Sequence, residues 1–430
     1  MRGVKLTAMM KVILKTLAEK RLVWRLALTL WILAILIYAV KVWLKTDYSD
    51  FNVYYSVSQR FLRADWFHIY DAEIDGSTPL RYAPPTIWVF APLALFSHQW
   101  ARELWFIMQA VAFSVGFGFL LKTLRASVAL RVTADFYFGL TMLFALRYVL
   151  DSYTNGQSSS LMFLCSCIGV WHLVKKQWFW VGFWFAWPAV MKLGPGTVFV
   201  YLALVHFKES KQWLKGAIVS TAASQLITSL VVAVIELKVG QWSPVSAFVT
   251  LWQRWVNIVS TDAQYALGYT DHYGNQALKG SLLRLAKLGW WSADAVRAYY
   301  SVIVVGVLLA VAIFWFLVSR KNWVRQKFNE SVTLVRSAGI ATLSYLILMP
   351  QTWKYSMPYL AIPFMAWLML PWRLGDRVVF VLFLVVFPLG GLDVVGETLF
   401  AWIQHASLPS LGMCWLILRL MGSEVRLSAT

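Results

Sequence analysis

The amino-acid sequence predicts an all-α polytopic membrane protein. Hydrophobic residues make up 60% of its 430 residues and charged residues only 14%, whereas soluble domains contain roughly 45–50% apolar and about 25% charged residues. The apolar residues also occur in blocks, many of which approach the roughly 20 residues that a helix needs to cross a bilayer. A soluble globular protein is therefore excluded.

The charge of the chain fits the same fold class. The 39 Lys and Arg residues outnumber the 20 Asp and Glu residues and leave a formal charge of +19. The basic residues cluster between apolar runs, where Lys and Arg set the orientation of membrane helices and contact anionic lipids. We therefore expect membrane lipids, and no nucleic acid, as the partners of this charge.

The first span is expected at residues 22–44. Residues 1–21 before it carry six basic side chains and a single acid, Glu19, so the positive-inside rule keeps this basic N-terminus in the cytoplasm. No small-residue cleavage site follows a short hydrophobic region, which favours an uncleaved anchor over a signal peptide. The chain would then emerge on the outer face at residue 45.

Residues 45–83 are the first predicted outer loop, which we expect to be catalytic. Six of the 20 acidic residues lie in it: Asp47, Asp50, Asp65, Asp71, Glu73 and Asp75. Five apolar residues in it recur at roughly helical spacing: Phe51, Tyr54, Tyr55, Phe61 and Leu62. This spacing predicts a helix in the membrane interface with its aromatic face in the lipid.

Further spans are expected near 101–121, 136–151, 158–174, 178–191, 194–207, 216–236, 298–318, 338–350, 355–371, 378–392 and 399–420. With the first, they give about 12 transmembrane helices. The whole chain, 1–430, would form a single integral membrane domain with both termini in the cytoplasm and a second large outer loop at 237–297.

Two interruptions affect this topology. Residues 84–97 are apolar but short, and either a tilted span or a re-entrant segment fits them. The apolar run 178–207 is broken at residues 192–196. Broken helices at membrane depth are tolerated where they line protein or a water-filled cavity, so this break points to a cavity.

Two ionisable residues are the leading candidates for chemistry. Asp50 lies just past the first span, where a partly desolvated carboxylate could act as general base toward a hydroxyl presented from the bilayer. Asp is also a favoured N-cap residue, so Asp47 or Asp50 could instead cap the following helix. Lys192 could bind phosphate as a point charge, or extend its amine from a helix end to the interface.

Several motifs that would indicate other chemistry are missing. The sequence contains no D-x-D pair to hold a divalent ion on a nucleotide sugar, and no G-x-x-x-x-G-K-[ST] loop. It also contains neither H-E-x-x-H nor G-x-S-x-G. ATP-driven transport, zinc proteolysis and an elbow-type hydrolase therefore lose support.

Six short motifs resemble glycosyltransferase family 87 in their order along the chain. They are Asp50-Phe51-Asn52-Val53-Tyr54-Tyr55, Arg81-Tyr82-Ala83-Pro84-Pro85, Asn155-Gly156-Gln157, Met191-Lys192-Leu193-Gly194-Pro195, Gly274-Asn275-Gln276-Ala277-Leu278 with Arg284, and Met349-Pro350-Gln351-Thr352-Trp353-Lys354-Tyr355. This family of membrane glycosyltransferases has the GT-C fold and includes a mycobacterial phosphatidylinositol mannoside mannosyltransferase. One departure is that the mycobacterial members carry His where this chain has Lys354 and Tyr355, which leaves the acceptor open.

The resemblance implies a metal-independent, inverting transfer without a cofactor, and Asp50 as the general base. The donor would be a polyprenyl-phosphate sugar, with mannose expected, and the acceptor a lipid-linked or envelope glycan. The reaction would take place on the outer face of the bacterial cytoplasmic (inner) membrane. Expected ligands of the donor phosphate are, in order of preference, Lys192, Arg81, Arg284 and Lys354. Expected contacts of the sugar or acceptor are Tyr54, Tyr82, Asn155, Gln157, Asn275, Gln276 and Trp353.

Other interpretations of these features stay open at the level of sequence. Asn155-Gly156 is also a turn signal, and Trp353 could be an interfacial anchor. A transporter or flippase of amphipathic lipid-linked substrates is the alternative function. Transporters more often show inverted repeats and paired broken helices, and a single break is evident here, which favours the enzyme.

Overall fold

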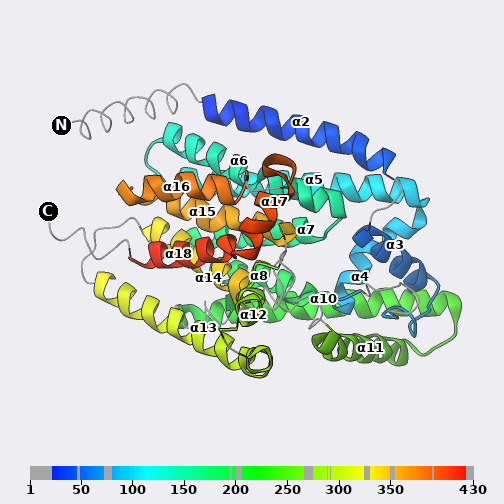
Figure 1. The fold of residues 1–430 in the computed structure, drawn as a ribbon. Helices are drawn as coiled ribbons and strands as arrows, with labels where there is room; N and C mark the ends of the chain where they lie inside the picture. The colour runs from blue at the N-terminus through cyan, green and yellow to red at the C-terminus, as the bar shows by residue number, and fades with distance from the viewer. Residues whose placement is uncertain are drawn as a thin grey trace, which may run out of the picture.

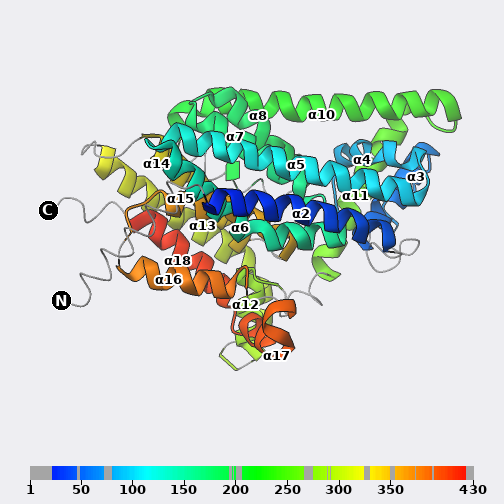
Figure 2. The same cartoon turned by 90° about the horizontal axis from the view of Figure 1, so that it is seen from above.

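The computed structural model describes residues 22–45, 49–71, 80–192, 196, 198–199, 206–265, 275–287, 289–290, 292–323, 330–348, 354–372, 374–389 and 392–422. Helices form nearly all of this part of the chain, and it contains no strand. The prediction of an all-α protein is therefore confirmed, and Figures 1 and 2 show the helices packed side by side.

The helices of the N-terminal half are α2 (Leu22–Leu44), α3 (Ser49–Leu62), α4 (Pro84–Phe90), η1 (Ala91–Leu95), α5 (His98–Ser127), α6 (Arg131–Asn155), α7 (Ser159–Val174) and α8 (Trp178–Met191). Those of the C-terminal half are η3 (Phe207–Glu209), α10 (Ser210–Val239), α11 (Pro244–Tyr265), α12 (Leu278–Lys287), α13 (Ala293–Trp323), α14 (Glu330–Leu348), η4 (Lys354–Leu360), α15 (Ala361–Leu368), α16 (Leu374–Val386), α17 (Leu392–His405) and α18 (Leu408–Gly422).

Four helical segments in the described part of the chain are long and apolar enough to cross a membrane: Leu22–Leu44, His98–Ser127, Phe207–Val239 and Glu330–Leu348. A bent pair, Ala293–Tyr300 and Val302–Val311, would make a fifth. The protein is thus a membrane protein by composition and helix length. The total of about 12 spans and the GT-C arrangement stay predictions.

The first predicted span coincides with α2, but the last one is wrong as a single helix. Residues 399–420 are divided between α17 and α18 by a turn at Ala406 and Ser407. Ser407 has a left-handed backbone, with φ of 55°, and Pro409 follows it in the first turn of α18. Proline fits the first turn of a helix and not its interior, so a new helix begins here.

The predicted helix after the first span is confirmed as α3, but its orientation toward lipid is wrong. Phe51, Tyr54 and Phe61 are almost fully buried within the protein. Their face of α3 packs against α4, η1 and α5, and the Tyr54 ring stacks on Phe90 at 4.4 Å between ring centres. Helical spacing correctly predicted that α3 has an apolar face. The face is covered by other helices of the protein and not by lipid.

The structure shows a short helical segment at one of the two interruptions in the apolar pattern and a helix end at the other. Residues 84–97 form α4 and η1, which together cover 84–95 and are shorter than the roughly 20 residues of a span. The break after residue 191 is confirmed, because α8 ends at Met191 and Lys192 is extended. Residues 193–195 and 197 lie outside the described residues.

Helices α8 and α10 approach each other closely through two glycines. A Cβ atom on Gly182 would collide with the backbone of Trp213, and one on Gly216 with the backbone of Phe179. Small residues allow such backbone contact between membrane helices. This packing fixes the direction of α8 and therefore the position of Lys192 at its end.

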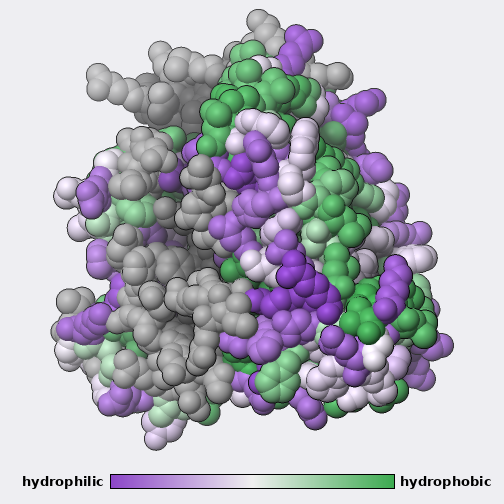
Figure 3. Space-filling model, turned by 90° about the vertical axis from the view of Figure 1, so that its right-hand side faces the viewer, coloured by the Kyte–Doolittle hydropathy of each residue, from purple (hydrophilic) through white to green (hydrophobic). Residues whose placement is uncertain are grey.

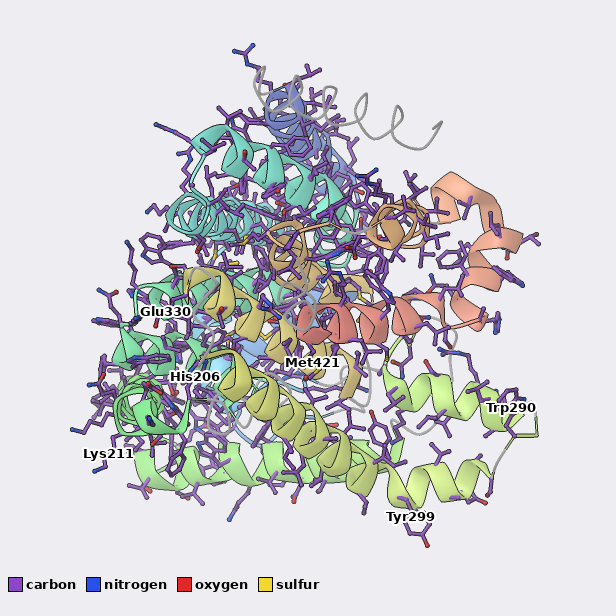
Figure 4. All side chains as sticks on the ribbon, turned by 90° about the vertical axis from the view of Figure 1, so that its left-hand side faces the viewer. His206, Lys211, Trp290, Tyr299, Glu330 and Met421 are labelled. Atoms are coloured by element: carbon purple, nitrogen blue, oxygen red, sulfur yellow. The ribbon has the colours of Figure 1, made fainter. Side chains whose placement is uncertain are left out.

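The two ends of the helix bundle differ. Figures 1 and 2 place α3 and α4 at one end and the start of α2 at the other. Figure 4 looks onto this second end, where Lys211, Glu330 and Met421 mark the start of α10, the start of α14 and the end of α18. The Lys176 amine lies 2.6 Å from the Glu330 carboxylate here. Turns that we expect in the cytoplasm thus meet at one end.

Candidate active site

The segment Arg81-Tyr82-Ala83 is held extended ahead of α4. Ala83 has φ of −63° and ψ of 155°, as expected for a residue before proline, and Pro84 then occupies the first turn of α4, where its missing N–H costs nothing. The Ala83 N–H donates to the Met191 carbonyl at 3.2 Å. This bond joins the segment to the end of α8, beside Lys192.

Gln157 lies in the tight connection between α6 and α7. Gly156 ends α6 in the left-handed conformation, with φ of 68°, which glycine adopts at helix C-termini without a steric penalty. The Trp105 indole N–H donates to the Gly156 carbonyl at 2.7 Å. The connection is thereby fixed, and the Gln157 side chain extends to α3.

Asp50 is the point at which these segments meet. It is the second residue of α3, and its carboxylate accepts a hydrogen bond from the Gln157 amide. Burial raises the pKa of the Asp50 carboxyl from 3.8 to about 6, while the Gln157 hydrogen bond and the positive charges of Lys192 and Arg81 lower it in part. Lys192 and Arg81 therefore lie close enough to act on the carboxylate.

Two tyrosines complete this group. Tyr54 lies one turn after Asp50, and its hydroxyl donates to the Tyr82 hydroxyl at 3.4 Å. The Lys192 ammonium lies 5.8 Å from the centre of the Tyr82 ring. Burial raises the pKa of Tyr54 well above its usual value, so this side chain is a neutral phenol. We call Asp50, Tyr54, Arg81, Tyr82, Gln157 and Lys192 the Asp50 cluster.

The end of the molecule that carries the cluster is hydrophilic at its centre. Figure 3 faces this end, and hydrophilic residues gather in the middle of the view, with hydrophobic residues beside and above them. Arg81 is exposed and Asp50 and Lys192 are partly exposed, whereas Tyr54, Tyr82 and Gln157 are buried. Solvent-exposed and buried side chains thus meet at the Asp50 carboxylate.

Three other predicted residues form a separate polar network. The Arg284 guanidinium donates to the Asn275 carbonyl at 2.8 Å and to the Ser407 hydroxyl at 2.7 Å. The Gln276 amide donates to the Gln404 side chain at 2.9 Å. We call this the Arg284 network, and its members are Asn275, Gln276, Ser281, Arg284, Gln404, Ser407 and Ser410. Both Figures 1 and 2 separate α12 and α17, which carry part of it, from α3 and α4.

The remaining predicted residues lie elsewhere or outside the described part. The Asn155 amide donates back to the Asp151 carbonyl at 2.7 Å, within the last turn of α6. The turn that Asn155-Gly156 signals is confirmed, because Gly156 ends α6 in a turn. Trp353 lies outside the described residues. Lys354 begins η4, but its side chain is also outside them.

Sequence reasoning missed three buried hydroxyls near the cluster. Ser158 lies beside the Tyr54 hydroxyl, and its only signal in the sequence is that it follows Gln157. Tyr345 and Tyr359 lie within electrostatic range of Tyr82, with their rings 5.6 Å apart. They come from α14 and η4, more than 250 residues further along the chain, so no local pattern connects them to the cluster.

The Asp50 cluster combines the groups that a transfer reaction on a phosphate-linked substrate needs. A carboxylate with a pKa near 6 can accept a proton at neutral pH. Two cations beside it can neutralise a departing anion, and phenol and amide groups can position hydroxyls. Among the described residues, no group of three or more His, Cys, Asp and Glu side chains could hold a metal ion.

The family comparison bears directly on this chemistry. The model of glycosyltransferase family 87 matches residues 80–344, which is 265 of the 430 residues. The match includes Arg81, Tyr82, Gln157 and Lys192, whereas Asp50 and Tyr54 precede it. No curated protein matches the chain. Because the match covers more than half of the sequence, the chain belongs to glycosyltransferase family 87 and is a membrane glycosyltransferase.

Proposed function

We propose that this glycosyltransferase transfers a sugar from a polyprenyl-phosphate donor to a lipid-linked or envelope glycan acceptor. Mannose is the expected sugar. The reaction takes place on the outer face of the bacterial cytoplasmic membrane, with both chain termini in the cytoplasm. The observation that carries the proposal is the Asp50 carboxylate, which lies within the electrostatic reach of Lys192 and Arg81 and has its pKa raised to about 6.

In this mechanism Asp50 is the general base. It takes the proton of the acceptor hydroxyl while the acceptor oxygen forms a bond to the anomeric carbon. The bond between that carbon and the donor phosphate oxygen breaks, and polyprenyl phosphate leaves with the bonding electrons. Attack opposite the leaving group inverts the anomeric centre. Since a lipid phosphate is already a good leaving group, positioning and deprotonation are the main tasks left to the protein.

The cations of the cluster have a matching role. Lys192 is fixed at the end of α8, and Arg81 is fixed by the extended segment before α4. Positive charge placed where a phosphate departs stabilises the transition state without reorganisation. Tyr54, Tyr82 and Gln157 would hold sugar or acceptor hydroxyls, since phenol and amide groups both donate and accept hydrogen bonds.

A donor panel tests the proposal. The purified full-length protein in vesicles is given labelled polyprenyl-phosphate sugars, one at a time, with bacterial membrane lipids and EDTA, and products are identified by mass. We expect one polyprenyl-phosphate sugar, mannose in the first instance, to give an inverted product. Transfer from a nucleotide sugar instead, or activity that EDTA abolishes and manganese restores, would contradict the donor and the metal-independent mechanism.

A further inference from the structure

Helix α11 has an apolar surface that the protein leaves uncovered. Ala247, Leu251 and Trp255 are buried against the rest of the molecule, and α11 packs on α10 and α4. A second stripe faces outward at helical spacing, formed by Val245, Val249, Trp252 and Val256. Val245 is 74% exposed and Val256 is 52% exposed. An open hollow of about 400 Å³ runs along this side and is lined by Phe248, Val249, Trp252, Gln253, Val256 and Asn257.

The exposed flank of α11 next to this stripe is polar, and its Gln253 and Asn257 form the polar edge of the hollow. Ser246, Gln253 and Asn257 are exposed there, and α11 is not among the candidate spans found in the described part of the chain. A helix with one apolar side and one polar side, and without the composition of a span, fits the plane of the membrane interface. The distribution of apolar and polar residues around α11 therefore favours a helix that lies on the bilayer.

The position of α11 in the chain also indicates that it lies at the membrane surface. It begins at Pro244, and α10, one of the candidate spans, ends at Val239. The four residues between them can reach at most about 17 Å even when fully extended. Figure 1 shows α11 directly beside α10. The start of α11 must therefore stay near the membrane surface at which α10 emerges.

Two contacts connect α11 to chain segments that adjoin the Asp50 cluster, one at Arg81 and one at Phe67 after α3. The Trp255 indole N–H donates to the Arg81 carbonyl at 3.3 Å, and Trp252 from the outward stripe packs edge-on against Trp255 at 5.2 Å. The Arg254 guanidinium lies 3.4 Å from the centre of the Phe67 ring. Displacement of α11 would therefore move the backbone of Arg81.

We propose that α11 is a membrane-contact helix whose outward stripe lies among the acyl chains of the outer bilayer surface, and that this contact positions Arg81 beside Asp50. The occupant of the hollow is membrane lipid. The second part rests on the proposed function, because it assigns Arg81 to the donor phosphate. The first part stands independently of any activity.

Spin labels test the lipid contact. Cysteines are placed singly at Val245, Val249 and Val256, and as a matched control at Ser246, in the full-length chain within phosphatidylethanolamine–phosphatidylglycerol vesicles. The labelled native chain gives the background from its three cysteines, Cys165, Cys167 and Cys414. We expect an oxygen-to-nickel-chelate collision ratio about tenfold higher on the outward stripe than on the polar side.

The same labels distinguish the other occupants. Val245 and Val256 are about 16 Å apart along the helix axis, so similar depths at both positions support a helix in the membrane plane. Frequent collisions with the water-soluble nickel chelate on the stripe would overturn the proposal. Low collision rates with both reagents would also overturn it, since they indicate a second copy of the chain or another protein over the stripe.

An activity arm tests the link to Arg81. Val249→Glu places a charge in the lipid-facing stripe, and Ser246→Glu places the same charge on the polar side. We expect KM for the lipid-linked donor to rise about tenfold in the first variant and to stay within about twofold in the second. Equal effects would overturn the link. If the unmodified chain has no such activity, the proposed function fails while the labels still decide the lipid contact.

Discussion

The Asp50 cluster and the Arg284 network contain similar residue types but use them differently. In the Arg284 network the guanidinium donates to a backbone carbonyl and to Ser281 and Ser407 hydroxyls, and these bonds join α12 to the turn before α18. In the Asp50 cluster a partly exposed carboxylate faces two cations and has its pKa raised to about 6. The comparison teaches that a buried cation can serve structure, whereas a carboxylate with a shifted pKa in a partly exposed site is suited to chemistry.

The largest expected effect comes from Asp50→Asn, which keeps the side-chain shape and removes the proposed base. We expect kcat/KM to fall about 1,000-fold, within the range of general base catalysis. The folded-state pKa of Asp50 is raised, so burial of its charge costs stability above pH 6, and the neutral variant should unfold at an equal or higher temperature at pH 7.5.

A matched control for Asp50→Asn lies in the same segment. Asp65 is partly exposed, and its carboxylate is 2.7 Å from the His68 ring nitrogen. Asp65→Asn should leave kcat/KM within about twofold, as for most surface substitutions. Full activity of Asp50→Asn, or an equal loss in both variants, would remove the distinction on which the mechanism depends.

Lys192→Met sharpens the comparison through two readouts. Loss of the cation should lower kcat/KM by about 10- to 100-fold, equivalent to about 1.4–2.8 kcal/mol, mainly through weaker stabilisation of the departing phosphate. Lys192 lowers the pKa of Asp50, so its removal should also shift the acid limb of the pH profile to higher pH. An unchanged acid limb would show that Lys192 does not face Asp50.

The unmodified enzyme should lose activity in acid. Asp50 must be ionised to accept a proton, and its pKa is about 6. The logarithm of kcat/KM against pH should therefore bend near pH 6 and fall about tenfold between pH 7 and pH 5. A flat profile over this range would mean that the base has an ordinary carboxyl pKa or is a different group.

The smallest effect on catalysis is expected from Arg284→Met, which tests the other side of the comparison. Loss of its hydrogen bonds leaves buried oxygen atoms unsatisfied, at a cost of about 1–3 kcal/mol, so the thermal midpoint should fall. The position of the acid limb should not move. Unchanged stability with a higher KM for the donor would instead support the prediction that Arg284 binds the donor phosphate.

Local patterns in the sequence predicted several elements correctly. The apolar run with its basic flank predicted α2 at its observed bounds, helical spacing predicted α3, and the turn signal Asn155-Gly156 coincides with the end of α6. Each of these depends on residues within a few turns of one another. The division of 399–420 into two helices was missed because the apolar composition of a run does not reveal the left-handed turn at Ser407.

Such local patterns could not predict the contacts between distant segments of the chain. Spacing could not tell whether the aromatic face of α3 meets lipid or protein, since both are apolar environments. Spacing also could not show that Lys192 and Arg284 have different surroundings. Lys192 lies beside Tyr82, whereas Arg284 donates to Ser407, 123 residues further along the chain. Both residues are single cations near motifs of the same family, and only their packing partners differ.

The sequence by itself determined an all-α membrane protein and its resemblance to a glycosyltransferase family, because composition, periodicity and short motifs are local properties. The same resemblance is the source of the proposal that Asp50 is the base. Only the tertiary structure decided which groups surround that carboxylate. Gln157 reaches it across 107 residues of sequence, and Lys192 and Arg81 approach from the end of α8 and the segment before α4. The pKa of about 6 follows from burial and from those charges, and these exist only when the chain is folded.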